Sequence, residues 1–276
     1  MITSDPRVRE YQIQSDLERW PARTRQMILS NDALATKVLA AYRNHVYQGD
    51  FDQLDLFVDP TKVAVDVGTN YGQYALKLAT LATGCLCIEP VKALRALEAL
   101  LPDNCVFRNV AAGRTRATTI LRIPRRDGLL FEALSTMATD NLLPGFQIEE
   151  QLTEVVTVDE LVEEAFPTSK VGFIKIDVEG LEDEVLEGCV RTIHGHRPNL
   201  QIECHGDESV AVVCGYLREL GYRGLFFFEH QIMDASGFVP EVHRAPENEW
   251  GSMTARGLEF DSSRYVCDFY FVPVSG

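Results

Sequence analysis

The alternation of apolar and polar positions changes character near residue 62. From there on, short apolar runs alternate with segments of amphipathic helical period, as in "VAVDVGTNYGQYALKLA". This alternation is typical of βα repeats, which build a parallel sheet flanked by helices. The apolar runs predict seven strands, at 63–67, 85–89, 105–108, 171–176, 200–204, 224–228 and 265–272. We therefore expect an α/β fold with a mostly parallel seven-stranded sheet.

The segments between these runs have the spacing of helices that pack on a sheet. We predict helices at 73–81, 91–100, 158–164, 181–193 and 209–220. Residues 1–60 are polar with helical spacing, and "NDALATKVLAAYRNHVYQ" offers Asn31 or Asp32 as an N-cap. We expect an N-terminal helical cap over 1–60 and one main domain over 61–276.

Two long stretches of the main domain fit no βα unit. Residues 114–156 contain "ATTILRI" and "TEVVTV", which predict two further strands around a loop with Gly and Pro. Residues 229–264 form a second irregular stretch. Because long loops in compact domains usually carry function, we assign substrate selection to both.

Composition narrows the classes of function. The chain has 276 residues, enough for one large domain, and its 26 Lys and Arg against 41 Asp and Glu give a formal charge of −15. Such a charge repels phosphate backbones, which argues against a nucleic-acid partner. The seven cysteines contain no C-x-x-C pair, the first residues lack the apolar core of a signal peptide, and no apolar run could span a membrane. We expect a cytoplasmic protein with reduced thiols.

The turn after the first strand carries the first candidate chemistry. Its glycines, Gly68 and Gly72, let the backbone approach a ligand and lead into a helix whose first N–H groups are free. A dinucleotide fingerprint G-x-G-x-x-G that starts at Gly68 would need glycines where the chain has Asn70 and Gln73. This mismatch disfavours an NAD-dependent oxidoreductase, which we keep as an alternative.

An acidic residue at the end of the second strand indicates a ribose. Glu89 follows Asp66 by 23 residues, where an acid binds the two hydroxyls of an adenosine ribose. NAD and S-adenosylmethionine both need such an acid. S-adenosylmethionine also has an amino-acid tail and a sulfonium cation, which suit Asp66 and Asn70. The pattern therefore favours S-adenosylmethionine as the cofactor.

Five motifs in order carry a resemblance to a known family. "VDVGTNYGQYA", "IEP", "NVAAG", "TVDEL" and "IKIDVEGLEDEVLEG" resemble the FkbM family of S-adenosylmethionine-dependent methyltransferases. The resemblance implies a class I Rossmann-like methyltransferase fold and methyl transfer to a hydroxyl of a sugar, polyketide or peptide-type metabolite, as in natural product biosynthesis. It also implies a set of residues around the cofactor: Asp66, Gly68, Asn70, Gly72, Glu89, Asn109, Val110 and Ala111.

Polar residues also end the fourth and fifth strands. Asp177 and Glu179 follow 171–176, and we expect them to face the loop after the first strand, because ligands bind where the strand order of a parallel sheet reverses. Lys175 alternates with apolar neighbours, so it either points into the site or shields a sheet edge. The fifth strand ends in Glu203 and His205.

These residues suggest how a hydroxyl could be methylated. The reaction needs alignment of the acceptor and removal of its proton. Asp177 and His205 are the candidate bases, and we expect Glu179 to orient one of them. A divalent metal such as Mg²⁺ held by Asp177, Glu203 and His205 is an alternative. The sequence leaves open the base, the metal, the acceptor and the oligomeric state, and a non-catalytic module of the same fold is the remaining alternative.

Overall fold

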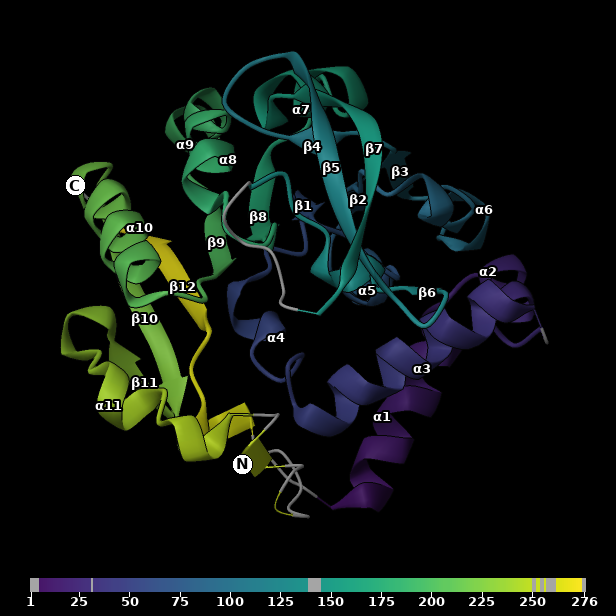
Figure 1. Cartoon of the computed structure of the whole chain (residues 1–276), viewed down its shortest axis with the longest axis horizontal. Helices are drawn as coiled ribbons and strands as arrows, with labels where there is room; N and C mark the ends of the chain where they lie inside the picture. Colours follow the sequence, from purple (N-terminus) through teal and green to yellow (C-terminus); the bar gives the residue numbers. More distant parts are fainter. Residues whose placement is uncertain are drawn as a thin grey trace.

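An open eight-stranded sheet forms the centre of the computed structural model, which describes residues 5–30, 32–138, 145–249, 252–253, 256 and 262–274 (Figure 1). The strand order is β11-β10-β12-β9-β8-β1-β2-β3. The strands are β1 (Val63–Val67), β2 (Gly84–Ile88), β3 (Cys105–Arg108), β8 (Val171–Ile176), β9 (Asn199–Glu203), β10 (Tyr222–Phe228), β11 (Gln231–Asp234) and β12 (Asp268–Pro273).

The five strands from β9 to β3 run parallel, and their order reverses between β1 and β8. Every residue of β1 and β8 is buried, as expected for central strands that are covered on both faces. β12 is inserted antiparallel between β9 and β10. The carboxyl ends of β1, β2, β8 and β9 therefore share one edge of the sheet.

The prediction of seven strands is wrong by one strand, and the sheet is mixed. The additional strand, β11, forms an antiparallel hairpin with β10 inside the stretch that we expected to be irregular. Glu229 and His230 make its two-residue turn, both with positive φ, at 47° and 63°. Such a turn usually contains Asn or Gly, so the Glu-His pair gives no sequence signal for it.

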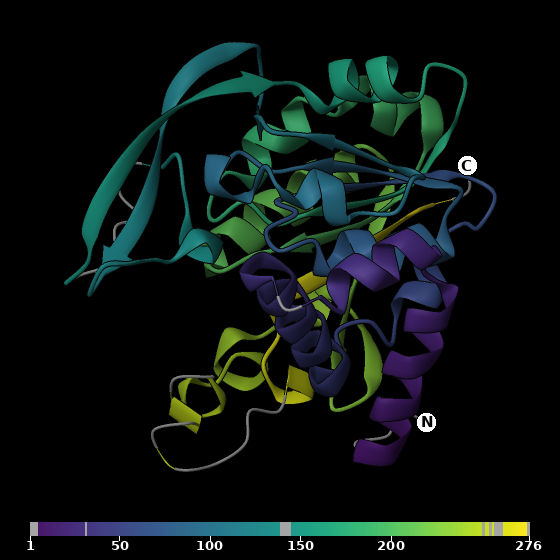
Figure 2. The same cartoon turned by 90° about the vertical axis from the view of Figure 1, so that its right-hand side faces the viewer.

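Helices cover both faces of the sheet. Figure 2 shows the purple N-terminal helices on one side and α7 to α9, teal to green, on the other. The helices are α1 (Pro6–Arg19), α2 (Ala22–Ile28), α3 (Ala33–Gln48), α4 (Leu54–Phe57), α5 (Gln73–Leu81), α6 (Leu97–Leu100), α7 (Val158–Ala165), α8 (Glu182–Glu187), α9 (Val190–His196), α10 (Asp207–Glu219) and α11 (Pro240–His243).

Buried polar contacts fix the N-terminal helices to α5, which follows the predicted cofactor loop. Asp16 of α1 accepts hydrogen bonds from Lys77 Nζ at 3.1 Å and from the Tyr42 hydroxyl of α3 at 2.7 Å. The Trp20 indole donates to the Leu76 carbonyl at 3.2 Å. Asp32 caps α3, as predicted for one of the two candidates. These contacts hold α1 and α3 in place beside the helix that shapes the site.

A second, four-stranded sheet lies over the carboxyl edge of the first. Its order is β4-β7-β5-β6, and the long strands β5 and β7 form a ribbon that projects beyond the main sheet (Figure 2). Its strands are β4 (Ala111–Ala112), β5 (Ala117–Arg126), β6 (Leu129–Leu130) and β7 (Gln147–Val156). The two further strands predicted within 114–156 are therefore confirmed. Residues 139–144 of that stretch, and parts of 250–261, lie outside the described residues.

The structure also shows the state of the cysteines and whether a described helix could span a membrane. All seven cysteines are free and at least half-buried. Within the described residues, no helix combines the length and apolarity that crossing a lipid bilayer requires.

Candidate functional site

A pocket opens at the carboxyl ends of β1, β2 and β8, under the second sheet. Leu121 of β5, Glu132 and Met137 from the 114–156 stretch form part of its wall. Six residues predicted from the sequence line it as well: Gly68, Asn70, Glu89, Ala111, Asp177 and Glu179. The loops predicted for the cofactor and the acids predicted for catalysis thus share one cavity.

The turn after β1 passes so close to β8 that it needs a glycine. Gly68 has φ of +81°, and a Cβ there would lie 1.8 Å from the carbonyl oxygen of Asp177. The Gly68 N–H donates to the Ile88 carbonyl at 3.0 Å, and the Asp177 N–H donates to the Val67 carbonyl at 3.1 Å. Backbone contacts therefore hold the three strand ends together beneath the pocket.

Backbone donors orient the acid predicted to bind a ribose. The carboxylate of Glu89 accepts from the N–H groups of Asn70 and Val91, each at 2.8 Å. Asn70 reaches this position with φ of 48°, in the left-handed region that Asn tolerates better than most residues. Glu89 is only 4% exposed, and its burial raises its pKa to about 7. The result is a carboxyl group held in a fixed position on the pocket wall.

The remaining residues predicted to surround the cofactor include four that lie next to the pocket wall without lining it. Asp66 is fully buried, and among the described residues neither carboxylate oxygen has a hydrogen-bond partner. Its burial raises its pKa to about 6. Gly72 starts α5 with φ of 78°. The Asn109 side chain donates to the Glu89 carbonyl at 2.7 Å, and Val110 packs against the core.

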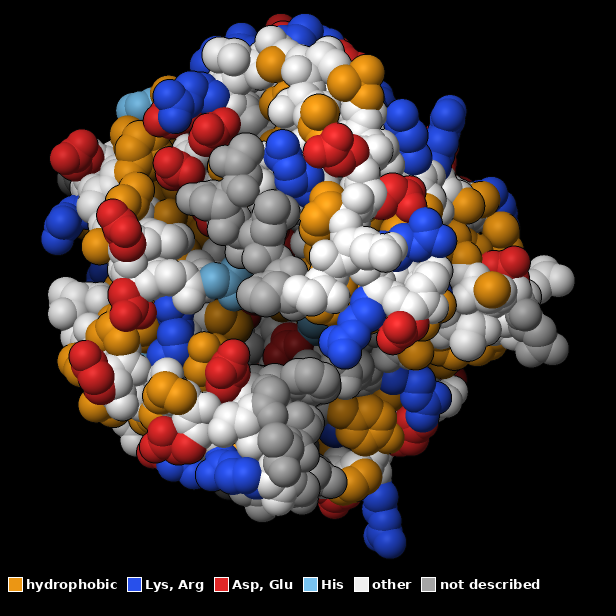
Figure 3. Space-filling view, viewed as in Figure 1, with side chains coloured by type: hydrophobic (Ala, Val, Ile, Leu, Met, Phe, Trp, Pro, Cys, Tyr) orange, Lys and Arg blue, Asp and Glu red, His pale blue; other side chains and the backbone are white. Residues whose placement is uncertain are grey.

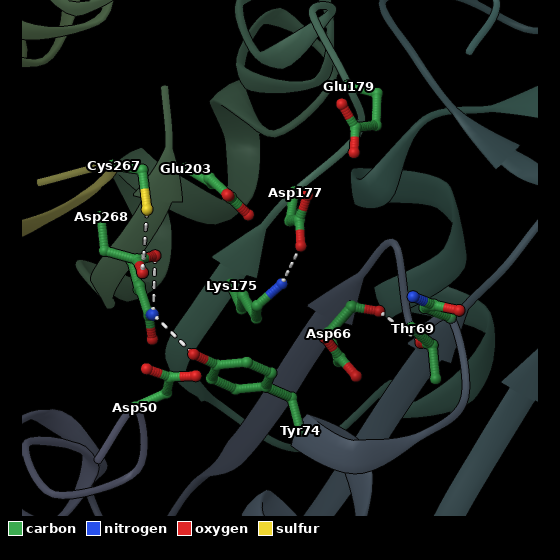
Figure 4. Close-up of polar contacts among 12 residues, drawn as sticks. Asp50, Asp66, Thr69, Tyr74, Lys175, Asp177, Glu179, Glu203, Cys267 and Asp268 are labelled. Carbon is green, nitrogen blue, oxygen red and sulfur yellow. Dashed lines mark hydrogen bonds and ion pairs between the residues drawn. The ribbon is translucent and has the colours of Figure 1, made fainter. Parts of the chain in front are cut away.

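Lys175 points into the site from the middle of the sheet. It is 3% exposed, and its Nζ lies 2.8 Å from Asp177 Oδ2 and 4.5 Å from the ring centroid of Tyr74 (Figure 4). The interpretation that it shields a sheet edge is wrong, because β8 lies between β1 and β9. The β8 strand thus places a buried cation beside Asp177, which lines the pocket.

The Lys175–Asp177 pair is held in its charged form. Burial alone would lower the pKa of Lys175, but the carboxylates of Asp177, Asp66 and Glu203 outweigh burial and raise it. Burial would raise the pKa of Asp177, but the Lys175 ammonium outweighs burial and lowers it. Asp177 is therefore a carboxylate whose charge is already compensated.

His205 extends the site toward β9. Its Nε2 lies 3.5 Å from Glu179 Oε2 and 3.5 Å from Glu203 Oε1, and its side chain is 48% exposed. Burial and the nearby charge of Asp177 raise the pKa of Glu179 to about 8. Ligand atoms of Asp177, Glu203 and His205 all lie within 4.8 Å of one another, so the three residues predicted for a metal do meet in space.

The sequence match agrees with this geometry. The model of the FkbM methyltransferase domain matches residues 66–223, more than half of the chain. The chain belongs to this family. The match begins at Asp66 and spans β1 to β9, so it includes each strand end that contributes to the pocket. No curated protein matches the sequence.

Solved structures give weaker likenesses. A methyltransferase FkbM from Methylobacillus flagellatus KT is 15% identical with a TM-score of 0.44, over 95% of this chain and 58% of that one. The chain thus spans less than two thirds of the Methylobacillus protein. A putative methyltransferase from Streptococcus mutans, solved with SAH, is 11% identical with a TM-score of 0.37, over 64% of this chain and 85% of that one. Precorrin-6y C5,15-methyltransferase from Geobacter metallireducens GS-15 is 11% identical with a TM-score of 0.36, over 68% and 80%.

Sequence reasoning missed three polar residues of this FkbM-family site. Gln201 of β9 donates through Nε2 to the Tyr74 hydroxyl at 3.1 Å and to Asp268 Oδ1 at 2.9 Å. Asp268 lies directly opposite Glu203 in the β9–β12 pairing. The available signal was a polar residue inside an apolar strand, as in "LQIE" and "CDFYF", because buried polar groups in strands need partners.

Proposed function

We propose that this chain is an S-adenosylmethionine-dependent methyltransferase that methylates a hydroxyl of a small or sugar-containing metabolite. The observation that supports this proposal is the shared pocket, in which Gly68, Asn70 and Glu89 face Asp177 and Glu179. When bound, S-adenosylmethionine supplies an electrophilic methyl group on a sulfonium cation. The alternative of an NAD-dependent oxidoreductase is not favoured, since the turn after β1 lacks the glycines of a dinucleotide site.

The residues fit this cofactor in charge and in hydrogen bonding. Glu89 receives only two backbone donors, so its carboxylate can still accept from the two hydroxyls of a ribose. The buried, unpartnered carboxylate of Asp66 lies behind the same turn. A ligand with cationic groups lowers the free energy of these acids in their ionised form, which burial otherwise disfavours. Pocket and cofactor are therefore complementary.

His205 is the general base that we propose for the acceptor hydroxyl. It is the most exposed of the polar side chains at this end of the pocket, and carboxyl groups lie 3.5 Å away in both Glu179 and Glu203. When the imidazole takes up a proton, either carboxyl group at that distance stabilises its charge in the ionised form. Asp177 is a weaker candidate, because its ion pair with Lys175 reduces its basicity.

The charge of Lys175 also bears on the metal alternative. The Lys175 ammonium lies 2.8 Å from Asp177, where it supplies the positive charge that a divalent ion would bring. We therefore favour a reaction without a metal. The measurement is turnover with and without EDTA, for which we expect a change of less than about twofold. Loss of turnover that added Mg²⁺ restores would place a metal at Asp177, Glu203 and His205.

The experiment that tests the proposed function has two parts. Calorimetry should show binding of S-adenosylhomocysteine and none of NADH, and the reverse result would favour the oxidoreductase. Transfer of a labelled methyl group to a panel of hydroxylated sugars and glycosylated metabolites then tests catalysis. Cofactor binding without transfer to any acceptor would favour a non-catalytic module of the same fold.

A further inference from the structure

A row of polar side chains crosses the face of the sheet that the N-terminal helices cover. In the strand register, Asp66 of β1 pairs with Lys175 of β8, Lys175 with Gln201 of β9, and Gln201 with Tyr270 of β12. Glu203 follows Gln201 by two residues and so lies on the same face of β9. The pocket that we propose for the cofactor lies at the β1 end of this row, and its lining residues include neither Glu203 nor Asp268 of the β9–β12 end.

Two acids face each other at that end. Glu203 and Asp268 are directly opposite on β9 and β12. Side chains in such positions have Cβ atoms about 4.5 to 5.5 Å apart, and like charges there destabilise a sheet. Burial and neighbouring acids raise the pKa of both carboxyls. Both residues keep some exposure. Figure 3 shows a hollow near the centre of the molecule in this view, with acidic side chains (red) in its depth.

The nearest lysine is shared among the acids of this row. The hydrogen bond that Lys175 donates goes to Asp177, and its ammonium lies over the ring of Tyr74. One lysine therefore faces several acids, among them Asp177 and Glu203.

A buried amide in the same row also has an unpartnered acceptor. Gln201 is fully buried, and both of its described hydrogen bonds are donated by Nε2, to Tyr74 and Asp268. Within the described part of the chain its carbonyl oxygen Oε1 has no hydrogen-bond partner. An unpartnered buried acceptor costs about 1 to 3 kcal/mol. Gln201 therefore adds an acceptor to a row in which the acids already outnumber the one lysine.

We propose that the acceptor of this enzyme carries a protonated amino group, which Glu203 and Asp268 bind. An ammonium has three donors and no acceptor, so it matches a site made of two carboxyls. A neutral hydroxyl would bring its own acceptor and no charge. The inference rests on the proposed function, because it names the substrate class of that same site: an amine-bearing, hydroxylated small molecule.

The bound amine would not be the methylated atom. A protonated nitrogen has no lone pair, whereas a hydroxyl can lose its proton to His205 as its oxygen takes the methyl group. His205 Nε2 lies 3.5 Å from Glu203, so an amine at Glu203 brings a neighbouring hydroxyl within reach of the base. The charged group thus orients the acceptor, and the hydroxyl reacts.

The test is calorimetry with three probes of one ring, namely glucosamine, N-acetylglucosamine and glucose, on protein with and without saturating S-adenosylhomocysteine. We expect glucosamine to bind at least about tenfold more tightly than the other two, as charge-assisted hydrogen bonds predict. Glu203→Gln and Asp268→Asn should each reduce that preference about tenfold or more. Glu219→Gln, on the exposed surface of α10, is the matched control and should keep it.

The outcomes separate this inference from the proposed function. If glucosamine binds no better than glucose to the wild-type protein, the inference is wrong, whatever the cofactor result. It is also wrong if both variants keep the preference, or if mass spectrometry places the transferred methyl on nitrogen. Absence of S-adenosylhomocysteine binding would instead contradict the proposed function, while the titration without that ligand still reports the amine preference.

Discussion

The two sides of the site meet at Asp177 but are built by different means. On the β1–β2 side, the main chain makes the decisive contacts. Main-chain N–H groups hold Glu89, and a glycine lets the turn pass over β8. On the β9–β12 side, side chains from distant segments meet in register, as Glu203 and Asp268 do. The first side is held mainly by main-chain hydrogen bonds, whereas the second depends on contacts between side chains of distant strands.

This difference suggests that one side recognises the cofactor and the other recognises a particular acceptor. A pocket wall made of backbone depends on few side chains, so it suits a cofactor that many relatives have in common. A wall of side chains changes with single substitutions and can follow a particular acceptor. We therefore expect substitutions on the first side to affect folding and cofactor binding, and those on the second to affect turnover and acceptor choice.

The largest effect should come from Gly68→Ala. A Cβ 1.8 Å from the Asp177 carbonyl oxygen forces β1 and β8 apart, so we expect a loss of about 4 kcal/mol or more in the free energy of unfolding. Urea denaturation measures it. Gly128→Ala is the control, because Gly128 also has φ of +81° but nothing within 4 Å, so it should lose only about 1 to 2 kcal/mol. Equal losses would show that the close approach is unimportant.

Next, His205→Ala should reduce turnover about 10²-fold at neutral pH and leave S-adenosylmethionine affinity unchanged, because we assign the cofactor to the other side of the site. Steady-state kinetics at neutral pH and calorimetry check this together. Wild-type turnover in the variant would move the base to Asp177 or Glu179.

Glu89→Ala should weaken S-adenosylmethionine binding by about 1.5 to 3 kcal/mol, because it removes charge-assisted contacts to the ribose. The free energy of unfolding should fall as well, since Ala cannot accept from the Asn70 and Val91 N–H groups. Calorimetry gives the dissociation constant. An unchanged constant in a folded variant would remove Glu89 from the cofactor site.

The smallest effect concerns Glu179 and pH. Its pKa is about 8 in the folded protein against an ordinary 4.5, so the fold favours the protonated form. The wild-type free energy of unfolding should therefore fall as pH rises from about 4.5 to 8, as the folded state gives up this proton. Gln at position 179 cannot ionise. The free energy of unfolding of Glu179→Gln should therefore fall by about 1 kcal/mol less than that of the wild type over this range, as measured by urea denaturation at pH 5 and 8.5. Parallel pH profiles would contradict this.

The β1–β2 side could be predicted from the sequence because its signals are local. Gly68 and Glu89 lie within one βα unit and the strand after it, where the order of strand, turn and helix fixes what the residues do. The structure places both on the pocket wall. Gly72 and Asn109 show the limit of this prediction. They belong to the same motifs, but they support the pocket wall without lining it.

The β9–β12 side could not be predicted because its contacts depend on pairings that no local pattern encodes. Asp268 faces Glu203 only because β12 enters antiparallel between β9 and β10. The β11 hairpin remained hidden for a similar reason, since its Glu-His turn resembles no preferred turn sequence. Lys175 remained ambiguous until the strand order showed that β8 has neighbours on both sides.

Because β12 lies near the end of the chain, the sheet cannot be completed until late in translation. β9 and β10 cannot be bridged until residues 268–273 have left the ribosome, so a nascent chain holds the whole nucleotide-binding half before the far wall exists. Pairings between distant segments also form slowly. During that interval the chain has two unpaired strand edges, which are prone to aggregate. A chain released before residue 268 would keep the Glu89 wall of the pocket but lack the carboxyl that faces Glu203.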